Sequence, residues 1–133
     1  MERYFSILKK WCDGLTARQI TRFTDKELYG RILCPACALV HGRCMGLVHP
    51  LLYLAEKTGD KKYTEAAQLL IDWSDFLEDS DGGIRNDTVC EWKGTTAFTA
   101  VAFTGALKGY SGLLDGEHRE KLNNHNHPFD GWL

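Results

Sequence analysis

Two stretches with the hydrophobic period of an α-helix lie next to each other in this 133-residue chain, separated only by Thr58-Gly59-Asp60. Apolar side chains recur at helical spacing over about residues 38–57, and again over about 61–78, where acidic residues back the apolar seam. Helices of about 20 and 18 residues are roughly 30 and 27 Å long, so a connection of a few residues joins them only as an antiparallel hairpin. The connection supplies a glycine that ends the first helix and an aspartate that caps the second.

Three further segments have helical character. The first covers about residues 2–13 and ends at Gly14, and a last partial helix begins near Asp115. The segment 95–108 differs from both, because apolar side chains surround its whole axis. Such a helix is expected to be buried between neighbours.

Strands are not expected, because no stretch alternates apolar and polar residues for long. The remaining segment before residue 38 is loop-like apart from a capping signal at Thr24-Asp25-Lys26-Glu27. Pro50 is expected to bend the helix in which it lies. We therefore predict an all-α chain of antiparallel helical hairpins, a single domain over residues 1–133 with an irregular tail at 123–133.

The composition describes one globular domain and excludes several classes of protein. The formal charge is −2 and basic residues are scattered, so we expect no nucleic-acid partner. The longest uncharged apolar run, residues 47–55, is far shorter than the roughly 20 residues of a membrane span, so we expect no membrane insertion. Charged residues interrupt the N-terminal segment, which is not typical of a signal peptide. The chain as given is expected to be cytoplasmic, or periplasmic or secreted if an N-terminal segment is missing.

The hairpin brings two polar stretches to the same end of the molecule. Because the helix 61–78 returns antiparallel to the helix before it, the segment 95–108 starts where the first helix of the hairpin began. Residues 34–44 and the long loop 80–93 must then share one end of the bundle. We call these two stretches, together with the start of the helix at residue 95, the rim. Long loops on a rigid scaffold commonly carry binding sites.

The hairpin sequence resembles the repeating unit of a known superfamily. Thr58-Gly59-Asp60-Lys61-Lys62-Tyr63-Thr64-Glu65-Ala66-Ala67 is similar to the helix connection of (α/α) toroids, the six-hairpin glycosidase-like enzymes, which include unsaturated glucuronyl hydrolases and heparinase-type lyases. Three more motifs resemble glycosyl hydrolases of polysaccharide-degrading gut bacteria, namely Cys34-Pro35-Ala36-Cys37, His41-Gly42-Arg43 and Trp92-Lys93-Gly94-Thr95-Thr96. The likeness spans roughly residues 30–115. A closed toroid needs more hairpins than this chain contains, so the resemblance implies a partial (α/α) toroid, the N-terminal part of a larger enzyme. Whether this short form is active or inactive stays open at this point.

Within this resemblance, three residues of the rim are candidates for catalysis. Glycoside hydrolysis commonly uses two carboxylates roughly 5 to 9.5 Å apart, and Asp87 and Glu91 are the better candidates on the rim. Asp81, followed by two glycines, is more simply explained as a turn residue. His41 has the chemistry of a general acid or base, although a histidine packed in the core explains it equally well.

Three neighbouring residues are candidates for binding an oligosaccharide or polysaccharide. In the family, Arg43 would hold a uronate carboxylate through a bidentate contact, because its planar guanidinium matches the carboxylate. Trp92 offers a surface for sugar stacking, and Lys93 offers a contact to an anionic group. The same residues also have structural explanations: a solvated arginine, and a tryptophan that packs against the start of the helix at residue 95.

Five cysteines, an odd number, argue against a framework of disulfides in a chain without an export signal. Cys34 and Cys37 have the CxxC spacing of a zinc site, which Cys44, Cys90 or His41 could complete as a structural zinc centre. Buried free thiols, or a disulfide or redox pair, explain the cysteines as well. A thioredoxin-like role is disfavoured because no βαβ pattern surrounds the motif.

The sequence leaves two functions open. In the first, the chain is part of a carbohydrate-active, glycoside hydrolase-like enzyme that acts on uronate-containing glycans. In the second, it is a small non-catalytic helical scaffold that forms a homodimer and carries a structural zinc. A dimer is expected because part of the apolar helix 95–108 stays uncovered within one chain. Its predicted contact residues are Phe98, Val101, Phe103 and Leu107.

Overall fold

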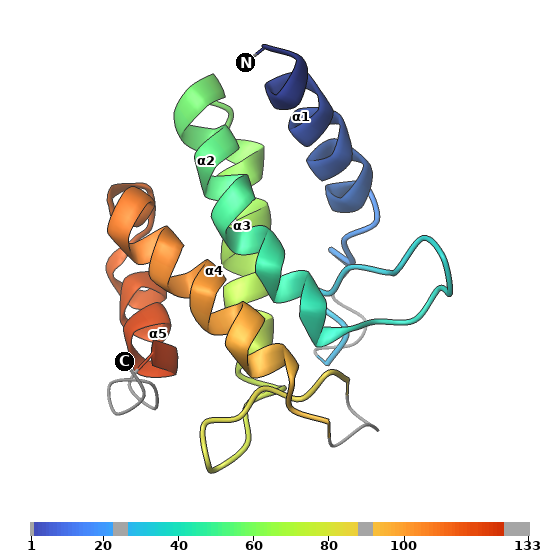
Figure 1. Ribbon diagram of the computed structural model, residues 1–133, viewed down its shortest axis with the longest axis vertical. Coiled ribbons are helices and arrows are strands. Elements are labelled where there is room, and N and C mark those ends of the chain that lie inside the picture. Colours follow the sequence, from blue (N-terminus) through green and yellow to red (C-terminus); the bar gives the residue numbers. More distant parts are fainter. Residues whose placement is uncertain (1, 23–26, 88–91, 127–133) are drawn as a thin grey trace.

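The computed structural model describes residues 2–22, 27–87 and 92–126, and over these ranges the chain consists of helices and connecting loops (Figure 1). The predicted all-α class is confirmed. The helices, with η denoting a 3₁₀ helix, are α1 (Glu2–Thr16), η1 (Gly42–Leu47), α2 (Val48–Thr58), α3 (Lys61–Ser74), α4 (Thr95–Tyr110), η2 (Ser111–Leu113) and α5 (Gly116–Asn126). No helix among the described residues is long and apolar enough to cross a membrane.

Helices α2 and α3 form the predicted antiparallel hairpin and lie side by side (Figure 1). Gly59 follows α2 in the left-handed conformation, with a φ of 69°, and its N–H donates to the Ala55 carbonyl. The Asp60 carboxylate accepts from the Lys62 N–H at 3.1 Å and caps α3. The connection therefore has the two roles that the sequence predicted.

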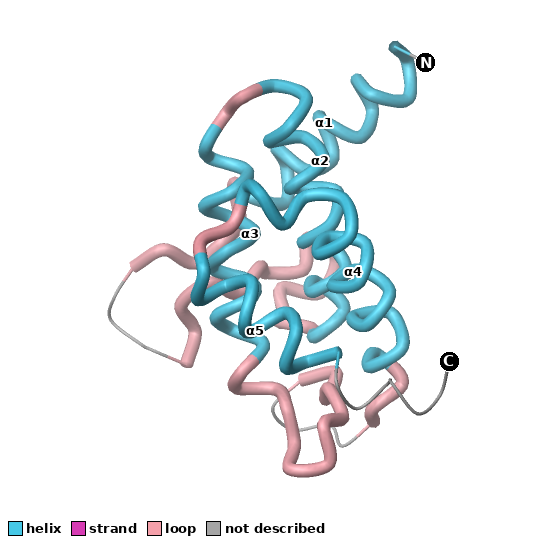
Figure 2. The backbone as a smooth tube through the Cα atoms, turned by 90° about the vertical axis from the view of Figure 1, so that its left-hand side faces the viewer, coloured by secondary structure: helices cyan, strands magenta, loops and turns pink. Residues whose placement is uncertain are grey.

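The core lies between α2, α3 and α4, and α5 packs against α3 and α4 (Figure 2). Helix α1 contacts α2 through an edge-to-face pair, Phe5 and Tyr53, whose ring centroids are 6.3 Å apart. The largest fully buried side chains come from all these helices except α1 and from the neighbouring segments. They are Trp73, Tyr63, Phe103, Ile32, Met45, Leu51, Leu52, Leu54, Leu70, Ile71, Leu77 and Leu122.

The prediction of a single α-helix over residues 38–57 is wrong. Residues 42–47 form the 3₁₀ helix η1, and α2 begins only at Val48. Pro50 consequently lies in the first turn of α2, where an α-helix leaves its N–H groups without intrahelical acceptors and the missing donor costs little. The bend predicted at Pro50 is replaced by a change from 3₁₀ to α geometry before it.

Other differences lie at helix ends. Helix α1 continues through Gly14 to Thr16, and α3 ends at Ser74 rather than near residue 78. Helix α5 continues to Asn126, inside the tail predicted to be irregular, and the rest of that tail is outside the described residues. Most of the capping signal at 24–27 is also outside them.

The composition of α4 predicted a helix buried on every side, and this prediction is wrong. Phe103 and Ala106 are fully buried against the core, whereas Phe98 and Val101 are 65% and 74% exposed. Of the four predicted dimer contacts, Phe103 is therefore already covered by its own chain, and Leu107 is partly covered. One apolar face of α4 remains open to solvent.

The two stretches of the rim meet at the lower end of the molecule in Figure 1. The Gly42 N–H donates to the Asn86 carbonyl, and a Cβ at residue 42 would overlap the Arg85 carbonyl oxygen. Two backbones far apart in sequence are thus in direct contact, which only a residue without a side chain permits. The predicted convergence is confirmed for the described residues of the rim.

Threonines at the start of α4 join this helix to the same loop. The Thr95 hydroxyl donates to the Ile84 carbonyl at 2.7 Å, and the Ile84 N–H donates to the Thr96 hydroxyl at 2.8 Å. Thr95 is fully buried, so its bond also satisfies a polar group that water does not reach. These bonds fix the loop at Ile84 to the start of α4.

We expect Gly42→Ala to lower the free energy of unfolding by about 1–3 kcal/mol, because the added methyl group would push the two rim backbones apart. Gly46 lies in the same 3₁₀ helix, with nothing within 4 Å of an added Cβ. Gly46→Ala should leave the free energy unchanged or raise it by up to about 1 kcal/mol. Urea denaturation followed by circular dichroism measures both variants. Equal losses of unfolding free energy in the two variants would show that the close contact of the two rim backbones at Gly42 does not contribute to stability.

Candidate functional site

A tight turn carries the first half of the rim. Leu33 and Val40 pair as an antiparallel bridge, and the Cys34 N–H donates to the Leu39 carbonyl at 2.8 Å. The Ala38 N–H returns to the Cys34 carbonyl at 2.9 Å, and Ala38 itself has a φ of 56°. The left-handed residue closes the turn, so the chain reverses between Cys34 and His41 and brings these two residues near each other.

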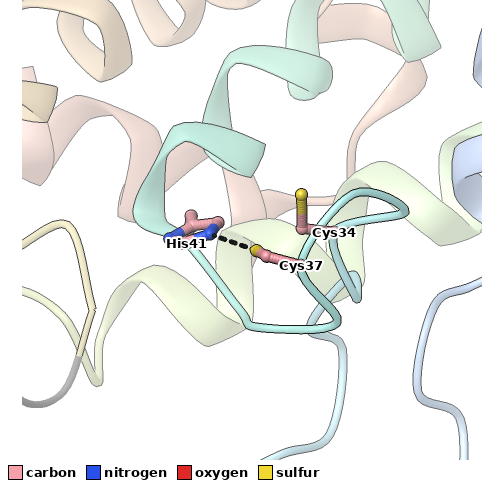
Figure 3. Close-up of side chains that lie close together, drawn as sticks. All are labelled: Cys34, Cys37 and His41. Carbon is pink, nitrogen blue, oxygen red and sulfur yellow. Dashed lines mark hydrogen bonds between the residues drawn. The ribbon is translucent and has the colours of Figure 1, made fainter.

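Three metal-binding side chains gather on this turn (Figure 3). The sulfurs of Cys34 and Cys37 and one ring nitrogen of His41 all lie within 4.8 Å of one another. The Cys37 sulfur is 3.2 Å from His41 Nε2. Hydrogen bonds from the backbone N–H groups of Ala36 and Cys37 lower the pKa of the Cys34 thiol. We call these three residues the thiol–imidazole cluster.

The other cysteines have different surroundings. Cys44, also predicted as a metal ligand, is outside the cluster, and its thiol donates to the Ile32 carbonyl at 3.8 Å. Burial raises the pKa of the Cys44 thiol above its ordinary value. Cys12 is fully buried, and burial raises the pKa of its thiol to about 11. Cys90, the last predicted ligand, lies outside the described residues. Buried free thiols thus explain Cys12, and the structure groups His41 rather than Cys44 with the CxxC pair.

Arg43 and Trp92 form a cation–π pair across the rim. The Arg43 guanidinium carbon is 5.6 Å from the centre of the Trp92 ring, and both residues are exposed. A Cβ at Gly94 would overlap the Trp92 indole, so the ring also rests on the start of α4. Trp92 therefore has its predicted structural role and still presents a surface to solvent.

Lys93 is held by carboxylates of its own chain. Its Nζ lies 2.7 Å from Asp81 Oδ2 and 2.9 Å from Asp79 Oδ2. Asp81 Oδ1 also accepts from the Gly83 N–H at 3.0 Å, which confirms its predicted role in the turn. With two anionic partners already in place, Lys93 is less suited than Arg43 to bind an anionic ligand.

Asp87 lies in another part of the rim, in a pocket of about 320 Å³ that Arg31 and Trp73 also line. Arg31 is 6% exposed, and its guanidinium carbon is 5.3 Å from the Trp73 ring. The Asn86 amide donates to the Asp87 carboxylate at 3.3 Å. The predicted partner, Glu91, is outside the described residues, so the separation of the two carboxylates stays a prediction.

Sequence analysis did not single out Arg31. One arginine in a loop-like segment carries no pattern, and its burial results from packing against α3, far along the chain. His41, the third predicted catalytic residue, belongs to the thiol–imidazole cluster. The candidates for catalysis are therefore divided between two parts of the rim.

Comparison with known proteins gives a family and a relative. Residues 8–133 match a family model described as the ulvan lyase N-terminal domain. A broad-specificity ulvan lyase of Formosa agariphila is 41% identical over 113 residues, which cover 82% of this chain and 17% of that protein. The chain thus spans less than a fifth of the length of this curated relative. No solved structure matches the chain.

These findings confirm the predicted relation to carbohydrate-active enzymes. They correct its finer part, because the relative is named a lyase where the sequence had indicated a glycoside hydrolase-like enzyme. The matched family model is also not that of the six-hairpin glycosidases.

The pairing of Lys93 with Asp81 predicts a measurable titration. Lys93, and then the Gly83 N–H, hold the pKa of the Asp81 carboxyl below its ordinary value of 3.8. A depressed folded-state pKa stabilises the fold above the unfolded pKa, near 4, and this contribution is lost as the pH falls through the folded pKa. We expect Lys93→Gln to raise the pKa of Asp81 toward 3.8 in an NMR titration of side-chain carboxyls. Lys108→Gln, at the far end of α4, should leave it unchanged, and an unmoved pKa in Lys93→Gln would contradict the pairing.

Proposed function

The chain belongs to the ulvan lyase N-terminal domain family, and from this we propose its function. The chain is the N-terminal helical part of a polysaccharide lyase and helps to bind ulvan or a related uronate-containing glycan. The match of residues 8–133 to the family model carries this proposal. The α2–α3 hairpin, with its glycine and aspartate caps, supports the finer proposal that this part is an arc of an (α/α) toroid.

A lyase makes different chemical demands from a hydrolase. In β-elimination a base removes the C5 proton of a uronate, its electron pair forms the C4–C5 double bond, and the glycosidic oxygen leaves C4 and takes up a proton. No water is added, so the two carboxylates of a glycoside hydrolase are not required. The reason for pairing Asp87 with Glu91 disappears with the hydrolase, whereas His41 retains the chemistry of an acid or base.

The C5 proton becomes more acidic when a cation neutralises the adjacent carboxylate. Arg43 suits this role, because its guanidinium carries N–H donors in a planar fork that matches a carboxylate, and it is exposed beside the Trp92 ring. Trp92 is 48% exposed and offers apolar surface to a sugar ring beside that charge. These two residues are therefore the proposed substrate contacts of this chain.

A chimera tests the proposal. In the Formosa agariphila enzyme, the aligned segment is replaced by the corresponding segment of this chain, and ulvan cleavage is followed by the ultraviolet absorbance of the unsaturated uronate product. We expect the chimera to cleave ulvan. Arg43→Ala in the chimera should lower kcat/KM by roughly 10- to 100-fold, the loss of one charge-assisted contact of about 1.5–3 kcal/mol.

Trp11→Ala is the matched control for Trp92→Ala. Trp11 is 52% exposed on α1, outside the rim, so its removal should leave cleavage unchanged, whereas Trp92→Ala should raise KM. A folded chimera in which Arg43→Ala leaves kcat/KM unchanged, or one in which both tryptophan variants behave alike, would contradict the proposal.

The open face of α4 favours a second candidate, a homodimer that acts as a scaffold. Phe98 and Val101 are exposed large hydrophobic residues on that face, and a two-fold interface would cover them. We expect light scattering at tens of micromolar to give a dimer. Val101→Asp should give a monomer, and Ile7→Asp, at an exposed position of α1, should not. A monomeric wild-type chain would contradict the dimer.

A further inference from the structure

The proposed lyase chemistry gives no role to the two thiols of the thiol–imidazole cluster. Its three ligand atoms nearly have the spacing of a metal site. Tetrahedral zinc, with Zn–S near 2.3 Å and Zn–N near 2.0–2.1 Å, places such atoms about 3.5–3.8 Å apart. Here the Cys37 sulfur and His41 Nε2 are 3.2 Å apart, and no pair of the three ligand atoms exceeds 4.8 Å. Side-chain movements on the order of 1 Å would complete the geometry.

The backbone of the turn holds the three ligand residues close together before any metal binds. The bridge between Leu33 and Val40 and the two hydrogen bonds of the Cys34 backbone hold the turn. All three side chains come from this turn and from the residue that directly follows its bridge (Figure 3). A metal ion would therefore bind a largely ordered set of ligands rather than having to order the loop itself.

The charge around Cys34 also suits a metal ligand. Zinc binds thiolates, and the N–H groups of Ala36 and Cys37 point at the Cys34 sulfur, with the positive charge of Arg18 nearby. Cys12 shows the opposite environment within the same chain, since it is fully buried and its pKa is raised.

We propose that Cys34, Cys37 and His41 bind one zinc ion, with a water molecule as the fourth ligand. A set of two thiolates and one imidazole binds zinc in preference to magnesium or calcium. Cys37 is exposed, so solvent reaches this cluster and can supply the water ligand. The ion would cross-link the turn to His41, whose neighbour Gly42 contacts Asn86, and would hold the first half of the rim against the second.

Cobalt titration of the reduced, metal-free full chain tests this site. We expect one equivalent of Co²⁺ to bind with a thiolate charge-transfer band and the visible bands of tetrahedral coordination, and zinc to displace it. Loss of an outer-shell partner alone costs 10- to 100-fold in metal affinity, so Cys34→Ser and Cys37→Ser should each cost more than about 100-fold. His41→Gln should cost at least about tenfold.

Two cysteine variants serve as controls. Cys12→Ala and Cys44→Ala should keep the cobalt affinity within about threefold of the wild-type value, because neither residue is in the cluster. Loss of binding in Cys44→Ala would overturn the assignment of water as the fourth ligand. Circular dichroism establishes that each variant is folded.

Alkylation of the wild-type chain gives an independent measurement that needs no variant. Zinc should slow the alkylation of Cys34 and Cys37, and leave that of Cys12 unchanged, as located by mass spectrometry. Three results would overturn the proposal. The first is the absence of the charge-transfer band, and the second is equal alkylation with and without zinc. The third is a Cys34–Cys37 disulfide that survives treatment with a reductant in the presence of zinc. None of these measurements depends on lyase activity, so the site and the proposed function fail separately.

Discussion

The packing of α2 against α3 fixes where every other part of this chain lies. Leucines of α2 and the large side chains of α3, Tyr63, Leu70 and Trp73, are almost completely removed from water, each contributing on the order of 1.5–3 kcal/mol. Because the two helices are antiparallel and joined by only Gly59 and Asp60, the segment before η1 and the loop after α3 have to meet at the opposite end. The backbone contact between Gly42 and Asn86 follows from that arrangement.

Local signals explain what the sequence predicted correctly. The hairpin depends on apolar periodicity and on Gly59 and Asp60, which act within a few residues of their own position. The turn that brings Cys34, Cys37 and His41 together is also local, although the sequence equally allowed Cys44 or Cys90 in that site. Such features need no knowledge of the rest of the fold.

Non-local contacts explain what the sequence did not predict. Residues 42–47 adopt a 3₁₀ helix where the Gly42 backbone is bonded to the loop beyond α3, and the bridge between Glu78 and Ile84 lies where the predicted helix should have continued. The apolar composition of α4 indicated burial, but hydrophobicity cannot tell which faces of a helix a neighbour covers. The pocket of Arg31 and Asp87 likewise joins segments that share no pattern.

The two halves of the rim are stabilised in different ways. The loop after α3 is held by ion pairs of Arg85 and Lys93 with Asp79 and by the buried hydroxyl of Thr95. The turn from Cys34 to His41 has no fully buried residue, and Leu39 is 61% exposed. Apolar burial, the main source of stability in the core, is therefore nearly absent from this turn. A few backbone hydrogen bonds, each worth about 0.5–1.5 kcal/mol, and the contact between Cys37 and His41 hold this turn of mostly exposed residues. A zinc ion bound by Cys34, Cys37 and His41 would add a cross-link to a turn that these hydrogen bonds already hold in shape and that has little apolar burial of its own.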